Sequence, residues 1–274
     1  MTTTGPDAPK QSPRRRRFLR PLLLALVLLA LAASGVLDVL LYRRADENYR
    51  RLSEAQLDPY GLKHPGFPPD AAGPTTRPDS PIVLFFGDSR ARGWPAPNLP
   101  GFRFVNRGVG NQTTEQVRGR FDAHVGPLSP RVVVVQAGIN DLKAIGLFPG
   151  RRDEIVADCK ANLREIVRRA AAGGAVVVVT TLFPPGDVPL DRRPVWSPDI
   201  ERAVEEVNAD LRTLASDRVI VLDAWKLLED RGRLRDGYGV DTLHLNERGY
   251  GVLNAELEKV LRKATVEGPR MKDD

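Results

Sequence analysis

The sequence predicts an α/β protein: a three-layer α/β/α sandwich with a mainly parallel five-stranded sheet, preceded by an N-terminal transmembrane helix. Short apolar runs without polar alternation recur along the body of the chain, and such runs suit strands buried on both faces of a parallel sheet. Segments of helical periodicity lie between them, as expected for helices that cover both faces of the sheet. A longer apolar stretch near the N-terminus stands apart from this pattern.

The positive charge of the chain is concentrated at its N-terminus. Residues 1–20 hold six basic side chains and one aspartate, so they account for five of the six net positive charges. A basic tail on a nearly neutral body does not describe a nucleic-acid-binding face. We therefore expect no nucleic-acid partner, and nothing in the sequence indicates an obligate protein partner.

Residues 21–41 form an apolar run that only Ser34, Gly35 and Asp38 interrupt. Its length is roughly the 20 residues that a helix needs to cross a membrane, and Asp38 falls near the interface at its end. The arginines at 14–17 and 20 precede the run, so the positive-inside rule places residues 1–20 in the cytoplasm as a basic tail. We predict a single-pass anchor, with the body of the chain outside the cytoplasm in the periplasm or the extracellular space.

Other interpretations of the apolar run stay open. Ala30-Leu31-Ala32 resembles a signal-peptide cleavage site, and cleavage there would give a secreted protein. The arginines before Phe18 also resemble a twin-arginine export signal, and a core helix is a further alternative. The apolar pattern resumes beyond Gly35, which favours a retained anchor over cleavage.

Residues 42–79 separate the apolar run from the body. The chain is charged from Tyr42 to about Ser53, where we expect the helix to continue. The following residues, up to Asp79, include six prolines with glycines between them, so they are predicted to form a semi-extended linker. The domain boundary then falls near Ser80, with one domain at residues 80–265 and a polar tail at 266–274.

The body alternates predicted strands and helices. Strands are expected at residues 81–86, 132–135, 176–179 and 219–222, with a weaker candidate at 102–105. Helices are expected at residues 114–125, 152–171, 198–215 and 247–263. Cys159, the single cysteine, falls among apolar residues of the second helix and is predicted to be a small buried side chain.

Ligands of such sheets bind at the carboxyl ends of the strands, so we examined the residues that follow each strand. Gly87-Asp88-Ser89-Arg90 follows the first strand and places a serine where a helix opens, which favours developing negative charge. An ordinary turn with a helix cap is the alternative interpretation. The G-x-S-x-G elbow that is typical of α/β-hydrolases is absent, because Ala91 follows Arg90.

Asp241-Thr242-Leu243-His244 lies near the end of the body. A serine hydroxyl is a weak nucleophile until a base takes its proton, and an imidazole needs a carboxylate to orient it. An aspartate three residues before a histidine can reach that histidine's ring. The other two histidines, His64 and His124, lie in the proline-rich stretch and at a predicted helix end.

Two further strand ends carry candidate residues. Asn140 follows the strand at 132–135, where its side-chain amide can donate a hydrogen bond to an oxyanion. The segment 106–114 follows the weaker strand and contains Gly108 and Gly110, which let a backbone N–H approach a ligand closely. Plain turns are the alternative interpretation of both.

The order of these four motifs resembles the SGNH hydrolase family, also called GDSL-type esterases and lipases. The resemblance covers residues 82–261 and implies a flavodoxin-like sandwich without a metal or other cofactor. It implies that Ser89 is the nucleophile and first oxyanion donor, Asn140 a side-chain oxyanion donor, Asp241 the orienting carboxylate and His244 the base.

Two residues depart from the family pattern. Arg90 replaces the usual leucine after the serine, a position that is not catalytic in the family. The family's oxyanion glycine falls at Asn111, and asparagine tolerates left-handed backbone conformations better than most residues. The second backbone donor is therefore Asn111, or Gly110 if the loop shifts by one residue.

The resemblance predicts an esterase that cleaves a small or exposed acyl group through an acyl-enzyme. An O-acyltransferase or deacetylase acting on a cell-surface glycan is the first alternative, and a non-catalytic binding module on the same fold is the second. Arg90, Arg92 and Arg107 are candidates for the mouth of the site, where they would favour an anionic substrate, and ordinary surface arginines are the alternative interpretation.

Overall fold

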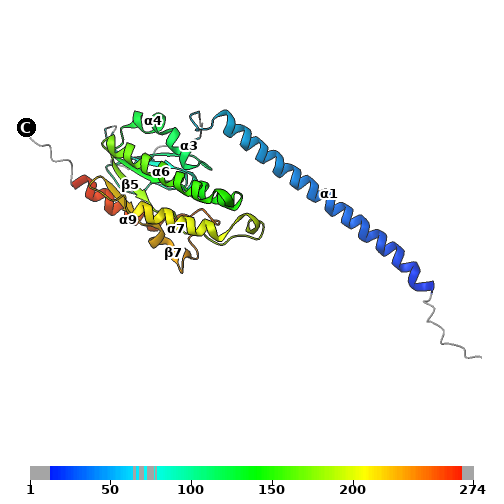
Figure 1. Cartoon of the computed structure of the whole chain (residues 1–274). Coiled ribbons are helices and arrows are strands. Elements are labelled where there is room, and N and C mark those ends of the chain that lie inside the picture. Colours follow the sequence, from blue (N-terminus) through cyan, green and yellow to red (C-terminus); the bar gives the residue numbers. More distant parts are fainter. Residues whose placement is uncertain (1–12, 64–65, 68–70, 73–76, 78, 267–274) are drawn as a thin grey trace, which may run out of the picture. The chain divides into compact units, whose positions relative to one another are not determined.

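The computed structural model describes residues 13–63, 66–67, 71–72, 77 and 79–266 and divides the chain into two compact units, Met1–Leu57 and Asp58–Asp274 (Figure 1). Most of the predicted basic tail at residues 1–20, and all but the first residue of the polar tail at 266–274, lie outside the described residues.

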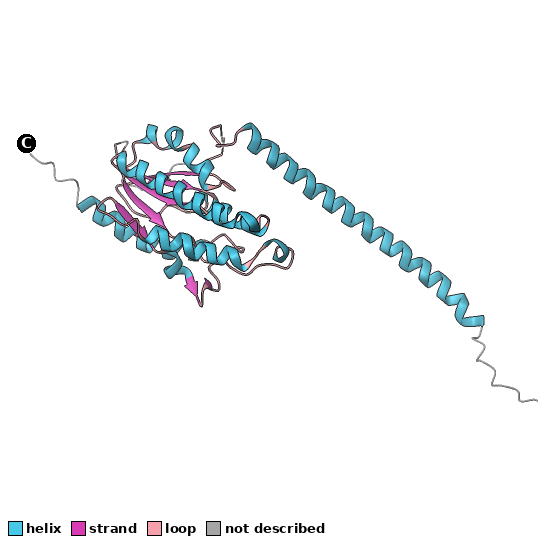
Figure 2. Cartoon of the chain, in the orientation of Figure 1, coloured by secondary structure: helices cyan, strands magenta, loops and turns pink. Residues whose placement is uncertain are grey.

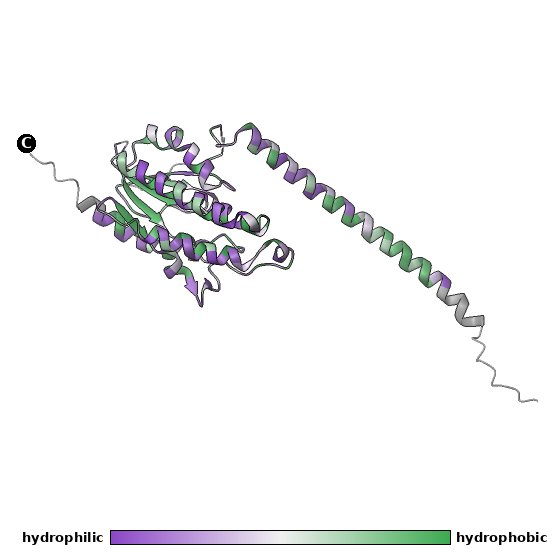
Figure 3. Ribbon diagram, viewed as in Figure 1, coloured by the Kyte–Doolittle hydropathy of each residue, from purple (hydrophilic) through white to green (hydrophobic). Residues whose placement is uncertain are grey.

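The first unit contains one helix, α1 (Pro13–Leu57). Its apolar residues are exposed, and the helix runs on through charged residues that pair along one face, as in the Arg50–Asp46 ion pair of 2.8 Å. The change from apolar to polar residues along α1 is visible in Figure 3. Within the described residues, only the helical segment Arg20–Leu57 is long and apolar enough to cross a membrane, a test that a signal sequence also passes.

The second unit is built on a six-stranded sheet with the order β1-β3-β2-β4-β5-β6. Its strands are β1 (Ala71–Ala72), β2 (Ile82–Gly87), β3 (Arg103–Gly108), β4 (Val132–Gln136), β5 (Val176–Thr180) and β6 (Val219–Leu222). β2 to β6 are parallel, which confirms the predicted five-stranded sheet, and the two-residue β1 adds an antiparallel edge to β3. The order of the parallel strands is that of flavodoxin-like folds, in which ligands bind where the order reverses, here between β2 and β4.

Helices lie between these strands and after the last of them (Figure 2). They are α2 (Ser89–Arg92), α3 (Thr114–Gly119), α4 (Phe121–His124), α5 (Ile139–Leu142), α6 (Arg152–Ala172), α7 (Pro198–Arg212), α8 (Ala224–Leu228) and α9 (Glu247–Val266). Four short 3-10 turns are η1 (Gly126–Leu128), η2 (Lys143–Gly146), η3 (Pro149–Arg151) and η4 (Arg193–Val195). After α8, β7 (Glu229–Asp230) and β8 (Arg233–Leu234) form a small hairpin.

Two hydrophobic cores lie on opposite faces of the sheet because successive strand residues point to opposite sides. Leu84 and Phe86 of β2 belong to the core that α3 to α7 cover. Val83 and Phe85 belong to the other core, which Trp94 and the helices α8 and α9 complete. The domain is therefore the predicted three-layer sandwich, with β2 buried on both faces.

The helix predicted at residues 114–125 is divided into α3 and α4, which is a correction. Arg120 lies between them with φ −98° and ψ 9°, outside helical geometry. Its buried guanidinium donates to Gln112 Oε1 at 2.6 Å and to the backbone oxygens of Arg107 and Gly87, each at 2.8 Å. Burial lowers the pKa of Arg120 to about 9. These inward bonds account for the interruption of the helix.

Part of the predicted linker is packed against the domain. Residues 58–63 belong to the second compact unit, and Gln116 of α3 donates a hydrogen bond of 2.7 Å to the backbone oxygen of Pro59. Cys159 is fully buried on α6, as its apolar neighbours predict, and burial raises the pKa of its thiol.

Candidate active site

Ser89 is the first residue of α2, directly beyond the carboxyl end of β2. The turn between them requires Gly87, whose φ is +153° and whose Cβ, if it had one, would lie 1.8 Å from the backbone oxygen of Gln136. The buried carboxylate of Asp88 then accepts a hydrogen bond of 2.8 Å from the backbone N–H of Arg90 and caps α2. Burial raises the pKa of Asp88. The serine is thus held at the strand end by a glycine turn and a buried cap.

His244 lies between Ser89 and Asp241. Its Nε2 is 2.9 Å from Ser89 Oγ, and its Nδ1 is 3.0 and 2.9 Å from the two carboxylate oxygens of Asp241. An ionised carboxylate only accepts hydrogen bonds, so Nδ1 carries the proton and Nε2 can accept the serine proton. The structure therefore brings together the three side chains that the sequence singled out.

Asp241 is held in its ionised form by its own loop. Burial acts to raise the pKa of this carboxyl group, but hydrogen bonds from the His244 side chain and from the backbone N–H groups of Leu243 and His244 outweigh it, so that the pKa is lowered. The two backbone bonds measure 2.7 and 2.9 Å. The same bonds fix the carboxylate beside the imidazole.

The loop between β3 and α3 approaches Ser89 from the side. An added Cβ on Gly110 would lie 4.0 Å from the Cβ of Ser89, so this glycine is next to the serine. Asn111 has φ +62°, the left-handed conformation that its residue type tolerates. We call residues 109–112 the oxyanion loop. Both candidate backbone donors are therefore on a loop that borders Ser89.

Asn140 joins the same loop from the end of β4. It is buried at the start of α5, and its Nδ2 donates a hydrogen bond of 2.9 Å to the backbone oxygen of Gln112. A side-chain amide has two N–H donors, so one remains for another acceptor. The amide thus links α5 to the oxyanion loop and keeps a further donor.

Two supporting residues were not identified from the sequence. Gln112 is buried and bonds Arg120 through its side chain and Asn140 through its backbone oxygen. Asp141 accepts hydrogen bonds from the backbone N–H of Thr114 at 2.9 Å and from its hydroxyl at 2.6 Å, which ties α5 to the start of α3. In the sequence, a supporting role for Asp141 is indicated only by its position directly after Asn140.

Arg90 does not lie at the mouth, which corrects the expectation of an arginine-ringed opening. Its side chain has no exposed surface. Its Nε donates to the backbone oxygen of Leu243 at 2.8 Å, and its guanidinium lies 4.9 Å from the ring centre of Phe183.

The other two arginines, the exposed Arg92 and the half-buried Arg107, both contact the segment 66–67. Arg92 donates to the backbone oxygen of Gly66 at 3.1 Å, and the Arg107 guanidinium lies 4.8 Å from the ring centre of Phe67.

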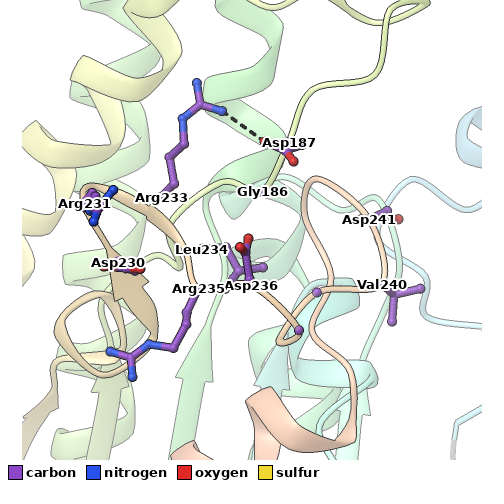
Figure 4. Close-up of a pocket in the computed structure, with 12 residues that line it drawn as sticks. Gly186, Asp187, Asp230, Arg231, Arg233, Leu234, Arg235, Asp236, Val240 and Asp241 are labelled. Carbon is purple, nitrogen blue, oxygen red and sulfur yellow. Dashed lines mark hydrogen bonds and ion pairs between the residues drawn. The ribbon is translucent and has the colours of Figure 1, made fainter.

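A polar pocket of about 480 Å³ borders Asp241. Figure 4 shows that it is formed by the β7–β8 hairpin, the turn at Gly186 and the loop before His244, with Arg233 reaching toward Asp187 at 3.4 Å. Both signs of charge line the pocket: the acidic residues are Asp187, Asp230, Asp236 and Asp241, and the basic ones are Arg231, Arg233 and Arg235. Among the described residues, no three His, Cys, Asp or Glu side chains gather where they could hold a metal ion.

Comparison with known families agrees with this geometry. The model of the GDSL-like lipase/acylhydrolase family matches residues 79–252, which include all the candidate residues. The chain belongs to this family. A search of curated proteins found no match to the chain.

Several solved structures share the fold of this acylhydrolase-family chain. A GDSL-like lipase from Bacteroides thetaiotaomicron is 21% identical, with a TM-score of 0.54 over 79% of this chain and 98% of the other. An acetylxylan esterase from Geobacillus stearothermophilus is 18% identical, with a TM-score of 0.51 over 67% and 94%. A lipase from a goat rumen metagenome is 14% identical, with a TM-score of 0.52 over 65% and 96%. Such identities show a common fold.

Proposed function

We propose that this GDSL-like family member is a serine esterase that cleaves carboxylic esters through an acyl-enzyme, with its catalytic domain outside the cytoplasmic membrane. The observation that carries the proposal is the continuous chain of hydrogen-bonding atoms from Ser89 Oγ through both ring nitrogens of His244 to the carboxylate of Asp241. That geometry is the one in which a serine hydroxyl can be activated by a base that a carboxylate orients.

The reaction follows from these positions. Ser89 Oγ attacks the ester carbonyl while His244 Nε2 takes the hydroxyl proton, and the resulting imidazolium is stabilised by Asp241. The imidazolium then gives this proton to the departing alcohol, which leaves the acyl group on Ser89. A water molecule, activated in turn by His244, attacks the acyl-enzyme and releases the carboxylic acid and the free serine.

The oxyanion that forms in each step needs hydrogen-bond donors that are already in place. We assign this role to the backbone N–H of Ser89, the N–H of Asn111 or Gly110, and the side-chain amide of Asn140. Two features support the assignment: the left-handed backbone conformation of Asn111, and the hydrogen bond from Asn140 to the backbone oxygen of Gln112. Both define the conformation of the oxyanion loop beside Ser89.

A glycan ester is the substrate class that one further observation favours. The pocket beside Asp241 is lined by carboxylates, guanidinium groups and glycine backbone, which suit a hydroxyl-rich ligand better than an acyl chain. The fold is shared with a protein described as an acetylxylan esterase. Deacetylation of a cell-surface glycan, or acyl transfer to one, therefore stays beside simple ester hydrolysis as a second candidate function.

The test uses the full chain in detergent with a fluorophosphonate probe and a chain-length series of nitrophenyl esters. We expect labelling and hydrolysis by the wild type, and neither by Ser89→Ala or His244→Ala, because the nucleophile or its activation is lost. Ser216→Ala, at an exposed position, is the matched control and should behave as the wild type. Labelling or turnover of Ser89→Ala at the wild-type rate would exclude Ser89 as nucleophile. A wild type that is neither labelled nor active on any of these esters would instead favour a non-catalytic binding module.

A further inference from the structure

Residues 58–63, which directly follow α1 in sequence, form a closed turn. The carboxylate of Asp58 accepts hydrogen bonds from the backbone N–H groups of Leu62 at 2.8 Å and Lys63 at 2.9 Å, and the N–H of Gly61 donates to the backbone oxygen of Asp58 at 3.0 Å. Gly61 has φ +67°, a conformation that favours glycine. These bonds give the turn a defined shape.

The turn contacts the oxyanion loop and α3. Gln112 Nε2 donates a hydrogen bond of 2.9 Å to the backbone oxygen of Tyr60. The ring of Tyr60 lies over Gly119, where an added Cβ would be 2.3 Å from the ring. Gly61 also lies close to the loop, because its added Cβ would be 3.0 Å from Gln112 Nε2 and 3.6 Å from a methyl group of Val109.

Gln112 connects this turn to the reacting groups. Its side-chain oxygen accepts from Arg120, its side-chain nitrogen donates to Tyr60, and its backbone oxygen accepts from Asn140. It is 5% exposed and directly follows Asn111. The position of the candidate backbone donors thus depends on Gln112, whose side-chain amide donates a hydrogen bond to the turn.

We propose that the turn at residues 58–63 is a positioning element for the oxyanion loop and that Tyr60 is its central positioning residue. The inference rests on the proposed function of the loop. Displacement of a catalytic group by about 1 Å can lower a rate by about 10²-fold, so a loop with glycine at 110 and a left-handed residue at 111 needs external support. The turn supplies that support through the Tyr60 carbonyl, while the ring of Tyr60 packed on Gly119 keeps the carbonyl in place.

The first experiment compares substitutions at the turn in the full chain in detergent micelles. Tyr60→Ala removes the ring, and we expect kcat on a small soluble ester to fall about tenfold with KM and Tm nearly unchanged. Tyr60→Phe keeps the ring and should restore kcat. Leu62→Ala, on the same turn with a side chain that is 51% exposed, is the matched control and should leave kcat unchanged.

Two substitutions in the domain test the same contact between the turn and its partners. Gly119→Ala places a methyl group where the Tyr60 ring lies and should reproduce Tyr60→Ala. Gln112→Glu keeps the acceptor for Arg120 but removes the donor to the Tyr60 carbonyl, so it should also lower kcat. Because Tyr60 acts through Gln112, the double variant Tyr60→Ala/Gln112→Glu should be no worse than Gln112→Glu alone.

Hydrogen exchange supplies a readout that does not require turnover. In Tyr60→Ala the backbone amides of residues 109–112 should exchange faster, while those of α6 and α7 should not change. Wild-type kcat and exchange in Tyr60→Ala, with Ser89→Ala inactive, would overturn the positioning role alone. Lower Tm with faster exchange throughout the domain would also overturn it, since that pattern describes general stabilisation. If Ser89→Ala were as active as the wild type, the proposed function would fail, and the exchange rates would decide the positioning role by themselves.

Discussion

Asn140 combines two tasks in one amide group. One N–H of Nδ2 holds the backbone oxygen of Gln112 at 2.9 Å, and we assign the other to the oxyanion. On this assignment, the side chain that fixes the oxyanion loop before the reaction would also stabilise charge during it. A substitution at this position should change both properties, by different amounts that can be measured separately.

Asn140→Ala should lower kcat by about 10²–10³-fold, the usual effect of losing an oxyanion donor. KM should change little, because the donor meets the oxyanion and not the ground-state carbonyl. The free energy of unfolding should fall by about 1–3 kcal/mol, since the buried carbonyl of Gln112 loses its partner. Steady-state kinetics and denaturant unfolding of one purified variant measure these effects.

Asn162→Ala is the matched control for this prediction. Asn162 lies on α6 and donates a hydrogen bond of 3.2 Å to the Thr114 hydroxyl. We expect it to lose stability while keeping kcat per folded molecule. An Asn140→Ala variant with wild-type kcat and reduced stability would instead make Asn140 a purely structural residue.

Residue type and spacing predict the reacting side chains but not the residues that support them. Asp241 and His244 could be paired from the sequence because three residues in a turn bring a carboxylate to an imidazole, and the 2.9 Å contact agrees with that. Gln112 and Arg120 could not, because their importance comes from bonds to strands and turns distant in the sequence. Arg90 was misplaced for a similar reason: its partners, Leu243 and Phe183, are brought to it only by the fold.

At the scale of elements, Asp141 connects α5 to the first residue of α3. Its carboxylate accepts from the backbone N–H and hydroxyl of Thr114, at a helix N-terminus where negative charge is favourable. Burial nevertheless dominates and raises the pKa of Asp141 to about 6. The contact between α5 and α3 therefore contains a carboxyl group whose pKa is close to neutral pH.

The raised pKa of Asp141 predicts the direction in which stability changes with pH. Because the pKa of Asp141 is higher in the folded chain than in the unfolded chain, its contribution to stability is complete below about pH 4 and is lost as the pH rises through about 6. The free energy of unfolding of Asp141→Asn, relative to that of the wild type, should therefore increase between pH 4 and pH 7 by on the order of 2 kcal/mol. Urea unfolding at several pH values measures the difference.

Comparing the variant with the wild type cancels the other titrating groups. Asp241, whose pKa is lowered, acts in the opposite direction and loses its contribution as the pH falls, but it does so in both proteins. Asp217→Asn, at an exposed position, corrects for the loss of one charge. A difference between Asp141→Asn and the wild type that does not change with pH would contradict the buried titration.

Buried strands were the elements most clearly visible in the sequence. The four valines of β4 and of β5 are apolar on both faces because both faces are covered, and the expected bounds differ from the observed ones by a single residue. The two alanines of β1 have no such pattern, so this edge strand was not predicted. The division between α3 and α4 was also missed, since helical periodicity does not reveal that Arg120 turns inward.

At the scale of the whole molecule, the chain divides into two compact units, and the apolar segment of the first bears on where the proposed esterase domain would work. The apolar part of α1 has exposed Leu and Val side chains along its length. Water is a poor solvent for such a surface, whereas the hydrocarbon core of a membrane matches its length. The arginines before it favour a cytoplasmic N-terminus.

We therefore expect the full chain, expressed in a bacterium, to stay with membranes through carbonate washing and to expose its catalytic domain to protease added to spheroplasts. Leu28→Arg places a charge near the centre of the apolar run, at a cost of about 3 kcal/mol for insertion, and should release part of the protein. Tyr49→Arg, in the charged part of α1, is the matched control and should stay membrane-bound, because that segment lies beyond the apolar run. A soluble exported form that begins near Ala33 or Gly35 would instead establish a cleaved signal peptide. Protection of the domain from external protease would reverse the proposed topology.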